Sequence, residues 1–181
     1  MRILALDVAT ATGWALYDLD RPPSAIISGS IKFVGDSAFE KVADMRRKLP
    51  KLVREHKPDF CAIEAPLTII PQYRKTKMDL LGEKEEVTTI NAGTVMQLNR
   101  LAGAAQICVT GQNIPCVEVA PRSWQTIIPR SIQGPPKARV KQFLDTMKVV
   151  SPNADSRDAC AIAIWCAGHC QQLKILERAS A

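Results

Sequence analysis

The sequence predicts an α/β fold, with a mixed five-stranded sheet that is antiparallel over its first three strands and flanked by helices. Short apolar runs rich in β-branched residues alternate with segments in which apolar residues recur every three or four positions. The first three runs are separated only by short turn sequences, which is typical of antiparallel neighbours. With 181 residues, of which 46% are hydrophobic, the chain suits one domain with a substantial core.

The first half of the chain contains four expected strands and one helix. The runs "RILALDVA", "GWALYDLD" and "SAIISGSIKFV" predict the antiparallel strands. Residues 37–56 have helical spacing, and we expect Pro50 to kink or interrupt this helix. The run "DFCAIEAP" predicts a fourth strand, which Pro66 stops. Residues 67–90 mix apolar, basic and acidic residues without a clear period, so we expect a long loop excursion there.

The second half is mainly helical. Residues 91–111 predict a helix of small residues that ends at Gly111, and "PCVEVAP" predicts the fifth strand. Residues 121–130 predict a short helix, and "KARVKQFLDTM" predicts another. The stretch "DSRDACAIAIWCAGHCQQLKIL" predicts one last helix. We therefore expect a single domain over residues 1–181, with its loop excursion at about 67–90.

The net charge of +6 is unevenly distributed, and residues 119–144 contain no acid. The cations in this stretch are Arg122, Arg130, Lys137, Arg139 and Lys141. A stretch of one sign suits a polyanion such as nucleic acid, although solvated basic faces are also common. The six cysteines form no CxxC motif, which fits reduced thiols better than a zinc site. No apolar run suits a bilayer and no signal peptide is evident, so we expect a cytoplasmic protein without membrane partners.

Four acidic residues mark the ends of predicted elements. Asp7 ends the first strand and Glu64 ends the fourth, each within an apolar run that predicts burial. Asp155 and Asp158 lie one turn apart at the start of the last helix, so their side chains can point the same way. Acids at a helix start are also favoured by the helix dipole, so this pair alone has a structural explanation. Buried carboxylates, however, must be paired, hydrogen-bonded or metal-bound.

Four converging carboxylates repel one another unless a cation lies between them. Arg2 or Arg157 is one alternative partner. Oxygen ligands without histidine are typical of Mg²⁺ or Mn²⁺. Two such ions about 3.5–4 Å apart are the usual arrangement for phosphodiester hydrolysis. The residues therefore predict a metal-dependent site for phosphoryl transfer.

The order of these acids resembles that of the RNase H-like nucleases, and within them the RuvC family of Holliday junction resolvases. The stretches that carry the resemblance are "ILALDVATATGWAL", "NAGTVMQLNRLAGAAQ" and "PNADSRDACAIAIWCAGH", with weaker support from "KARVKQFL". The resemblance implies a Mg²⁺-dependent endodeoxyribonuclease that resolves four-way (Holliday) junctions by paired hydrolysis and leaves 5′-phosphate ends. It also implies that Mn²⁺ can replace Mg²⁺. The implied metal ligands are Asp7, Glu64, Asp155 and Asp158.

The resemblance further implies a homodimer, with residues 91–110 in its interface. The alternative is that the small residues of this segment only allow close packing inside the domain. The resemblance implies that Lys137 helps to hold the scissile phosphate, whereas an ordinary solvated lysine is the alternative. An aromatic residue that wedges into the open junction corresponds to Tyr73, which is otherwise a common loop tyrosine. The residues expected to contact DNA are Tyr73, Arg74, Lys75, Lys77, Arg122, Arg130, Lys137, Arg139 and Lys141.

The departures from the family pattern concern positions other than the acids. The segment between Glu64 and the helix within residues 91–110 is longer than is typical of the family. Ala9 stands where the family often has glycine, and Gly13 is left to turn the chain. Where the family has a second lysine, the stretch "RSWQT" offers Arg122 and Trp124. The alternative functions are an RNase H-like nuclease for other branched or flap DNA or for RNA–DNA hybrid, and a non-catalytic DNA-binding protein. Four acids facing phosphate count against the non-catalytic alternative.

Overall fold

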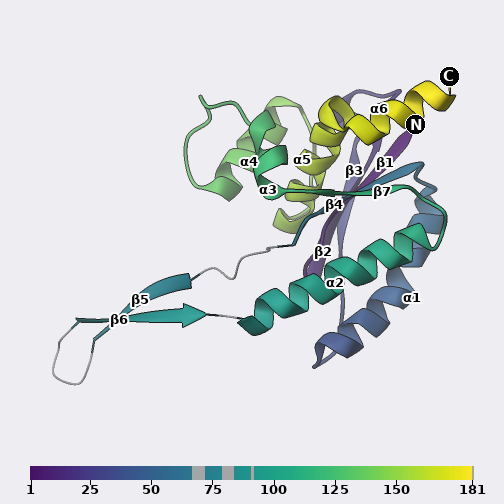
Figure 1. Cartoon of the computed structure of the whole chain (residues 1–181). Coiled ribbons are helices and arrows are strands. Elements are labelled where there is room, and N and C mark those ends of the chain that lie inside the picture. The colour runs from purple at the N-terminus through teal and green to yellow at the C-terminus, as the bar shows by residue number, and fades with distance from the viewer. Residues whose placement is uncertain (67–71, 79–83, 91, 181) are drawn as a thin grey trace.

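The computed structural model describes residues 1–66, 72–78, 84–90 and 92–180. Figure 1 shows one sheet with helices on both faces, and a separate pair of strands that stands apart from it. The strands of the sheet, in spatial order, are β3 (Ile27–Lys32), β2 (Ala11–Asp18), β1 (Arg2–Asp7), β4 (Phe60–Glu64) and β7 (Cys116–Val119). The predicted mixed sheet is confirmed, because β1 pairs antiparallel with β2 and parallel with β4. The pairs β2–β3 and β4–β7 are antiparallel and parallel, respectively.

Alternating side chains of β1 build two separate cores. Ile3 and Ala5 belong to the core on one face of the sheet, whereas Leu4 and Leu6 belong to the core on the other. All four are fully buried. A strand covered on both faces reads as an almost continuous apolar run, and this explains the composition of "RILALDVA".

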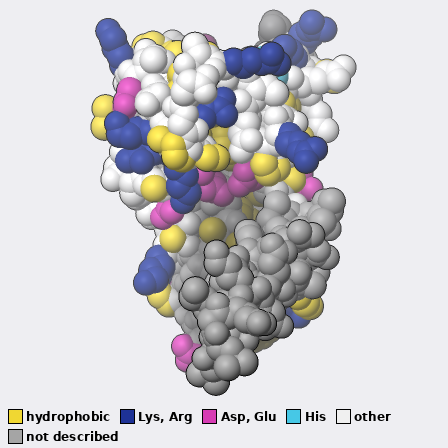
Figure 2. Space-filling model, turned by 90° about the vertical axis from the view of Figure 1, so that its left-hand side faces the viewer, with side chains coloured by type: hydrophobic (Ala, Val, Ile, Leu, Met, Phe, Trp, Pro, Cys, Tyr) yellow, Lys and Arg dark blue, Asp and Glu magenta, His cyan; other side chains and the backbone are white. Residues whose placement is uncertain are grey.

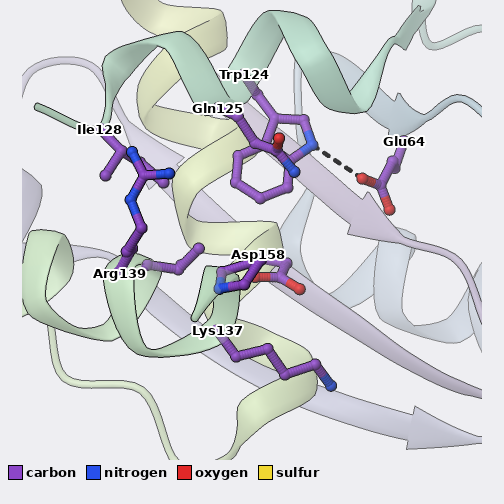
Figure 3. Close-up of a pocket in the computed structure, with 9 residues that line it drawn as sticks. Glu64, Trp124, Gln125, Ile128, Lys137, Arg139 and Asp158 are labelled. Atoms are coloured by element: carbon purple, nitrogen blue, oxygen red, sulfur yellow. Dashed lines mark hydrogen bonds between the residues drawn. The ribbon is translucent and has the colours of Figure 1, made fainter. Parts of the chain in front are cut away.

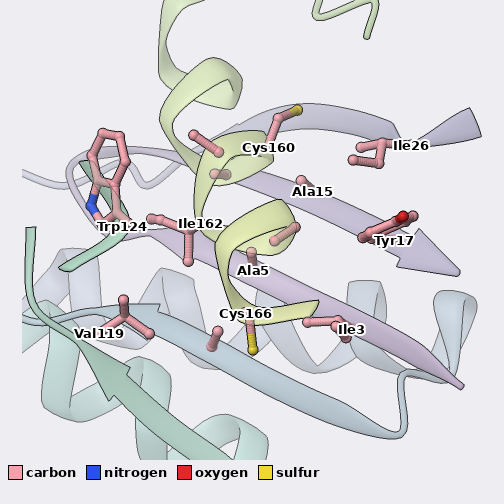
Figure 4. Close-up of a cluster of buried hydrophobic side chains, with 14 of the residues drawn as sticks. Ile3, Ala5, Ala15, Tyr17, Ile26, Val119, Trp124, Cys160, Ile162 and Cys166 are labelled. Carbon is pink, nitrogen blue, oxygen red and sulfur yellow. The ribbon is translucent and has the colours of Figure 1, made fainter. Parts of the chain in front are cut away.

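Helix α5 (Ala154–His169) covers the first face of the sheet and carries two of the candidate acids. Figure 4 shows this helix lying across the strands, with Ile162 above Ala5. Many of its buried residues are small, so the helix can approach the strands closely. Helix α4 (Pro136–Thr146) packs against α5 through Val140, Phe143 and Leu144, which are all buried. The short helices α3 (Pro121–Trp124) and η2 (Gln125–Ile127) lie on the same side, and a further turn, η1 (Pro23–Ala25), precedes β3.

Helices α1 (Ala38–His56) and α2 (Ala92–Thr110) cover the second face. The predicted interruption of α1 at Pro50 is wrong, because the helix continues through this residue. Proline removes one hydrogen bond from a helix, but four buried side chains around it anchor α1 on the sheet. These side chains are Met45, Leu49, Leu52 and Val53.

The prediction of one continuous last helix is also wrong. Cys170 has extended dihedral angles (φ −72°, ψ 114°) and separates α5 from α6 (Gln171–Ser180). Both Cys170 and Leu173 are buried in the same core, so the break turns α6 back onto the domain. The apolar spacing continues across the break, and for this reason the sequence does not reveal it.

The expected excursion at 67–90 contains regular structure where we predicted a loop. Strands β5 (Gln72–Met78) and β6 (Lys84–Ile90) pair antiparallel, with Lys77 opposite Glu85 in the register. The mixture of charges in both strands conceals their period, although opposite charges on paired strands favour pairing. The single-domain organisation over residues 1–181 remains a prediction.

All six cysteines are free, and four of them are buried. Burial raises the pKa of Cys160 to about 11 and thereby keeps its thiol neutral. No helix within the described residues combines the length and apolar character that crossing a membrane requires.

Candidate active site

Neighbouring parallel strands place the first two acids together. Asp7 is the last residue of β1, and Glu64 is the last residue of β4. Because these strands are parallel, their carboxyl ends meet at the same edge of the sheet. Both residues are partly buried, and their carboxyl groups share a hydrogen bond. The structure thus brings Asp7 and Glu64 together, as the strand ends predicted.

The other two acids lie at the start of α5, where side chains fix the end of the helix. Asn153 is the N-cap, and its side chain accepts a 2.9 Å hydrogen bond from the Ser156 N–H. The Ser156 hydroxyl in turn lies 2.6 Å from that of Ser151. This network orients the first turn, from which Asp155 and Asp158 project as partly buried residues.

Gly13 allows the start of α5 to lie directly against the sheet. Gly13 pairs with Asp7 in the register of β1 and β2. A Cβ atom at Gly13 would lie 1.8 Å from the carbonyl oxygen of Asp155, which is far inside van der Waals contact. Gly13 therefore serves close packing within β2, and not the turn we expected. The turn itself is closed by Thr12, whose hydroxyl accepts from the N–H of Ala9 and donates to its carbonyl oxygen.

Burial and like charge oppose the ionisation of this cluster. Burial is the largest cause of a rise in the pKa of Asp7 from 3.8 to about 8, and the charges of Glu64 and Asp155 add to it. Burial and the charge of Asp7 also raise the pKa of Asp158 to about 6. Lys137 opposes both rises. Without a cation, the cluster therefore holds protons at pH values where free aspartates are ionised.

The chemistry of the four donors fits a hard divalent cation. All four are carboxylates, the ligands that Mg²⁺ prefers, and a cation would relieve the repulsion that raises the two pKa values. Across the part of the chain that the structure describes, however, no three His, Cys, Asp or Glu side chains are already arranged to hold a metal ion. The acids lie near one another, but they do not form a finished coordination shell.

A pocket of about 230 Å³ opens beside Glu64 and Asp158. Its walls come from α3, η2, α4 and the acids themselves, as Figure 3 shows. Within this pocket, the indole Nε1 of Trp124 donates a 2.9 Å hydrogen bond to Oε1 of Glu64. The sequence indicated Trp124 only as a substitute for a family lysine. No local signal reveals this partner, because the contact joins residues that are 60 positions apart.

Lys137 is the predicted basic residue that the structure brings to the acids. It lies in the first turn of α4, is exposed, and lines the pocket together with Asp158, past which its side chain extends (Figure 3). Arg139 lines the same pocket, but its Nε donates a 3.0 Å hydrogen bond to the carbonyl oxygen of Ile132. Arg139 therefore also holds the loop that precedes α4.

The remaining predicted DNA contacts differ in their surroundings. Lys141, Arg122 and Arg130 are all exposed, and Lys141 also forms a 2.7 Å ion pair with Asp145. Figure 2 shows acidic side chains gathered in a band on this face, with Lys and Arg side chains around it. The side chains of four further candidates lie outside the described part of the structure, although their backbone belongs to β5. These are Tyr73, Arg74, Lys75 and Lys77.

Two curated proteins are similar to the chain in sequence, whereas no protein-family model matches it. The chain is 24% identical over 159 residues to the crossover junction endodeoxyribonuclease RuvC of Chromohalobacter salexigens, covering 84% of this chain and 73% of that protein. It is 25% identical over 171 residues to the protein of the same name from Ruegeria pomeroyi, covering 91% and 89%.

Solved structures show the same fold at lower identity. RuvC of Thermus thermophilus in complex with a Holliday junction substrate has a TM-score of 0.63 at 14% identity, over 92% of both chains. Another structure of Thermus thermophilus RuvC has a TM-score of 0.60, and the yeast mitochondrial Holliday junction resolvase has a TM-score of 0.53. The chain is therefore similar in sequence to two RuvC proteins, and it shares the fold of the RuvC structures, which is RNase H-like.

Proposed function

We propose that this protein is a Mg²⁺-dependent endodeoxyribonuclease that resolves Holliday junctions. The observation that carries the proposal is the meeting of Asp7, Glu64, Asp155 and Asp158 at one edge of a RuvC-like fold. The names of the two bacterial relatives support junction cleavage, and so does the junction bound to one structural neighbour. Paired hydrolysis would leave 5′-phosphate ends.

The four acids would hold Mg²⁺, for which Mn²⁺ would substitute. Bound ions of this kind supply charge that activates water and stabilises the leaving oxygen of a phosphodiester. The chain's own residues would orient and neutralise the DNA around that centre. Lys137 lies beside the acids and would meet an oxygen of the scissile phosphate, because its charge offsets their repulsion of DNA.

We propose that the surrounding basic residues contact the DNA backbone. Arg122 and Arg130 are exposed on the helical side of the acids, and Arg139 lines the pocket next to Glu64. Lys141 would contact a phosphate of the DNA, either while it keeps its ion pair with Asp145 or after that pair breaks. On β5, we propose that Tyr73 stacks on a base at the junction while Arg74, Lys75 and Lys77 contact phosphates.

We propose that two copies associate through α1 and α2. Phe39 and Ile107 are 80% and 73% exposed, and they line an apolar hollow of about 470 Å³ with Gly103 and Ala104. Large exposed apolar residues in one patch are typical of interaction surfaces. The small residues of α2 would thus serve both roles we considered, because Ala105 packs inside the domain. A homodimer would carry two sites for paired cuts.

We propose that the enzyme works in the cytoplasm of a bacterial or phage-infected cell, where its DNA substrate and reducing conditions occur. The relatives come from bacteria, and all six thiols are free.

Cleavage of a labelled four-way junction in Mg²⁺, beside a linear duplex of the same sequence, tests the proposal. We expect paired symmetric nicks in the junction only. Asp7→Asn should abolish cutting while binding persists or improves, since it removes a negative charge that faces phosphate. Asp36→Asn is the matched control, because Asp36 is exposed and lies in the loop before α1. If Asp7→Asn cuts at the wild-type rate, the site assignment is wrong.

Cleavage without junction preference would retain the active site and replace the proposed substrate by branched DNA in general or by hybrid. Binding without cleavage of any of these substrates would favour the non-catalytic alternative.

A further inference from the structure

Trp124 reaches Glu64 through the way in which β7 leads into α3. Val119 at the end of β7 pairs with Glu64 in the parallel register, and its carbonyl oxygen accepts a 2.9 Å hydrogen bond from the Ala65 N–H. Helix α3 then begins at Pro121, a residue that is well suited to the first turn of a helix. This short path returns Trp124 to the level of the acids.

The hydrogen bond from Trp124 holds Glu64 on one side. The indole is only 3% exposed, and Nε1–H can donate but not accept. A buried donor of this kind needs a partner, and a carboxylate oxygen gives it a charge-assisted bond. Glu64 therefore lies between the indole N–H and the carboxyl group of Asp7.

We propose that Trp124 is a positioning residue, which holds Glu64 in the orientation that allows this carboxylate to bind the metal ion. The inference rests on the proposed function, because it assumes that Glu64 is a ligand. Trp124 itself touches neither metal nor phosphate in this assignment. Outer partners of metal ligands commonly change metal affinity by about 10-fold to 100-fold when they are removed. Among the described residues, no three acids are already arranged to coordinate a metal ion. A Glu64 side chain held in place by Trp124 would fix the position of one ligand before the metal binds.

Calorimetric titration of the full chain with Mg²⁺ tests the inference without relying on cleavage. Trp124→Phe keeps an aromatic ring and removes the N–H, and we expect it to weaken Mg²⁺ binding roughly 10-fold or more. Trp165→Phe is the matched control, because Trp165 lies at the end of α5 away from the acids. There its ring stacks on that of His169, with 5.9 Å between the ring centroids. We expect Trp165→Phe to bind Mg²⁺ as the wild type does.

A double-mutant cycle separates a positioning role from lost packing. If Trp124 acts through Glu64, Trp124→Phe should change Mg²⁺ affinity far less in a Glu64→Gln background than in the wild type. Lost packing alone would give the same change in both backgrounds. An equal change in both backgrounds would overturn the inference.

The indole N–H resonances supply a readout that holds even if Trp124→Phe fails to fold. The chain has three tryptophans, so the Trp124 resonance follows by elimination from Trp14→Phe and Trp165→Phe. Mg²⁺ and Glu64→Gln should each shift it. A Trp124 resonance unmoved by saturating Mg²⁺, or unchanged Mg²⁺ affinity in Trp124→Phe, overturns the inference alone. A wild-type protein that binds no Mg²⁺ overturns the proposed function as well.

Discussion

At Asp7, burial and charge act against each other. Its pKa in the folded protein is raised to about 8, so the folded state binds a proton that the unfolded state has already lost. Stability without metal therefore falls as the pH rises from about 4 to 8. The group that is proposed to bind the metal is thus one that destabilises the metal-free protein.

Asp7→Asn should stabilise the metal-free protein at pH 8, because the neutral amide avoids burying a charge at this position and also removes the repulsion from Glu64 and Asp155. We expect the melting temperature to rise by about 2–8 °C at pH 8 and to change little at pH 4. Mg²⁺ should raise the melting temperature of the wild type but not of the variant. A variant that melts below the wild type at pH 8 would contradict this explanation.

Protons and Mg²⁺ should compete for the same acids. Because the pKa of Asp158 is raised to about 6 and that of Asp7 to about 8, Mg²⁺ affinity should increase across this interval. Cutting at limiting Mg²⁺ should rise over the same range, and saturating Mg²⁺ should move its midpoint to lower pH. Junction cleavage from pH 5.5 to 9 at two Mg²⁺ concentrations measures this, and an identical midpoint at both would sink the idea.

The acids were predictable as candidates because each one ends a strand or opens a helix. The partner of Glu64 was not, since the contact with Trp124 depends on how β7 returns the chain to the strand ends. The role of Gly13 was equally hidden, because a close approach to Asp155 leaves no trace in the local sequence. The residue types thus predicted which side chains form the candidate site. The contacts that hold these side chains in place depend on the tertiary structure and could not be predicted.

Among the elements, α5 matters most, because it joins the core to the site. Its apolar run predicted burial. Short turns and strand-like composition predicted the antiparallel pairing of the first three strands, but not the positions of β4 and β7 in the sheet. The sequence did not predict the helix break at Cys170, nor the strands β5 and β6. The two failures have different causes. Apolar spacing continues across Cys170, whereas charge obscures the strand pattern in β5 and β6.

Gly13→Ala should displace the start of α5 from the sheet. The new methyl group would overlap the backbone of Asp155, so we expect a loss of about 1–3 kcal/mol or more in the free energy of unfolding. Mg²⁺ affinity should fall with it. Gly168→Ala is the matched control, because no atom of the described residues lies within 4 Å of the place its new methyl group would take, and we expect it to stabilise α5 by up to about 1 kcal/mol. Urea unfolding and Mg²⁺ titration measure both effects, and equal stability of the two variants would contradict the packing argument.

On the scale of the whole molecule, the acids occupy one place on a chain of net charge +6. Junction affinity should therefore fall steeply with salt, by a logarithmic slope of about −0.9 for each phosphate contact. Arg130→Gln should make this slope less steep by about 0.9, the contribution of one phosphate contact. Lys51→Gln, on the exposed side of α1, should leave it unchanged. Binding by the wild type that stays constant from 50 to about 200 mM salt would exclude a phosphate-contacting surface.

The proposed dimer gives a second prediction at this scale. Ile107→Glu places a charge in the apolar hollow between α1 and α2, so sedimentation should show a monomer. Ile175→Glu changes another exposed isoleucine, on α6, and should leave the dimer intact. If the Ile107→Glu variant still forms dimers, the interface does not lie in the hollow between α1 and α2.

The separation of the acids along the chain has a consequence for synthesis. Asp7 is made almost first, whereas Asp155 and Asp158 follow only after every strand of the sheet. The strands of a nascent chain can therefore form before α5 has been synthesised, and until then α5 does not cover the face of the sheet that carries Ile3 and Ala5. Synthesis that stops before α5 would give a strand scaffold that carries only Asp7 and Glu64, so under the proposed assignment such a fragment would lack two of the four metal ligands.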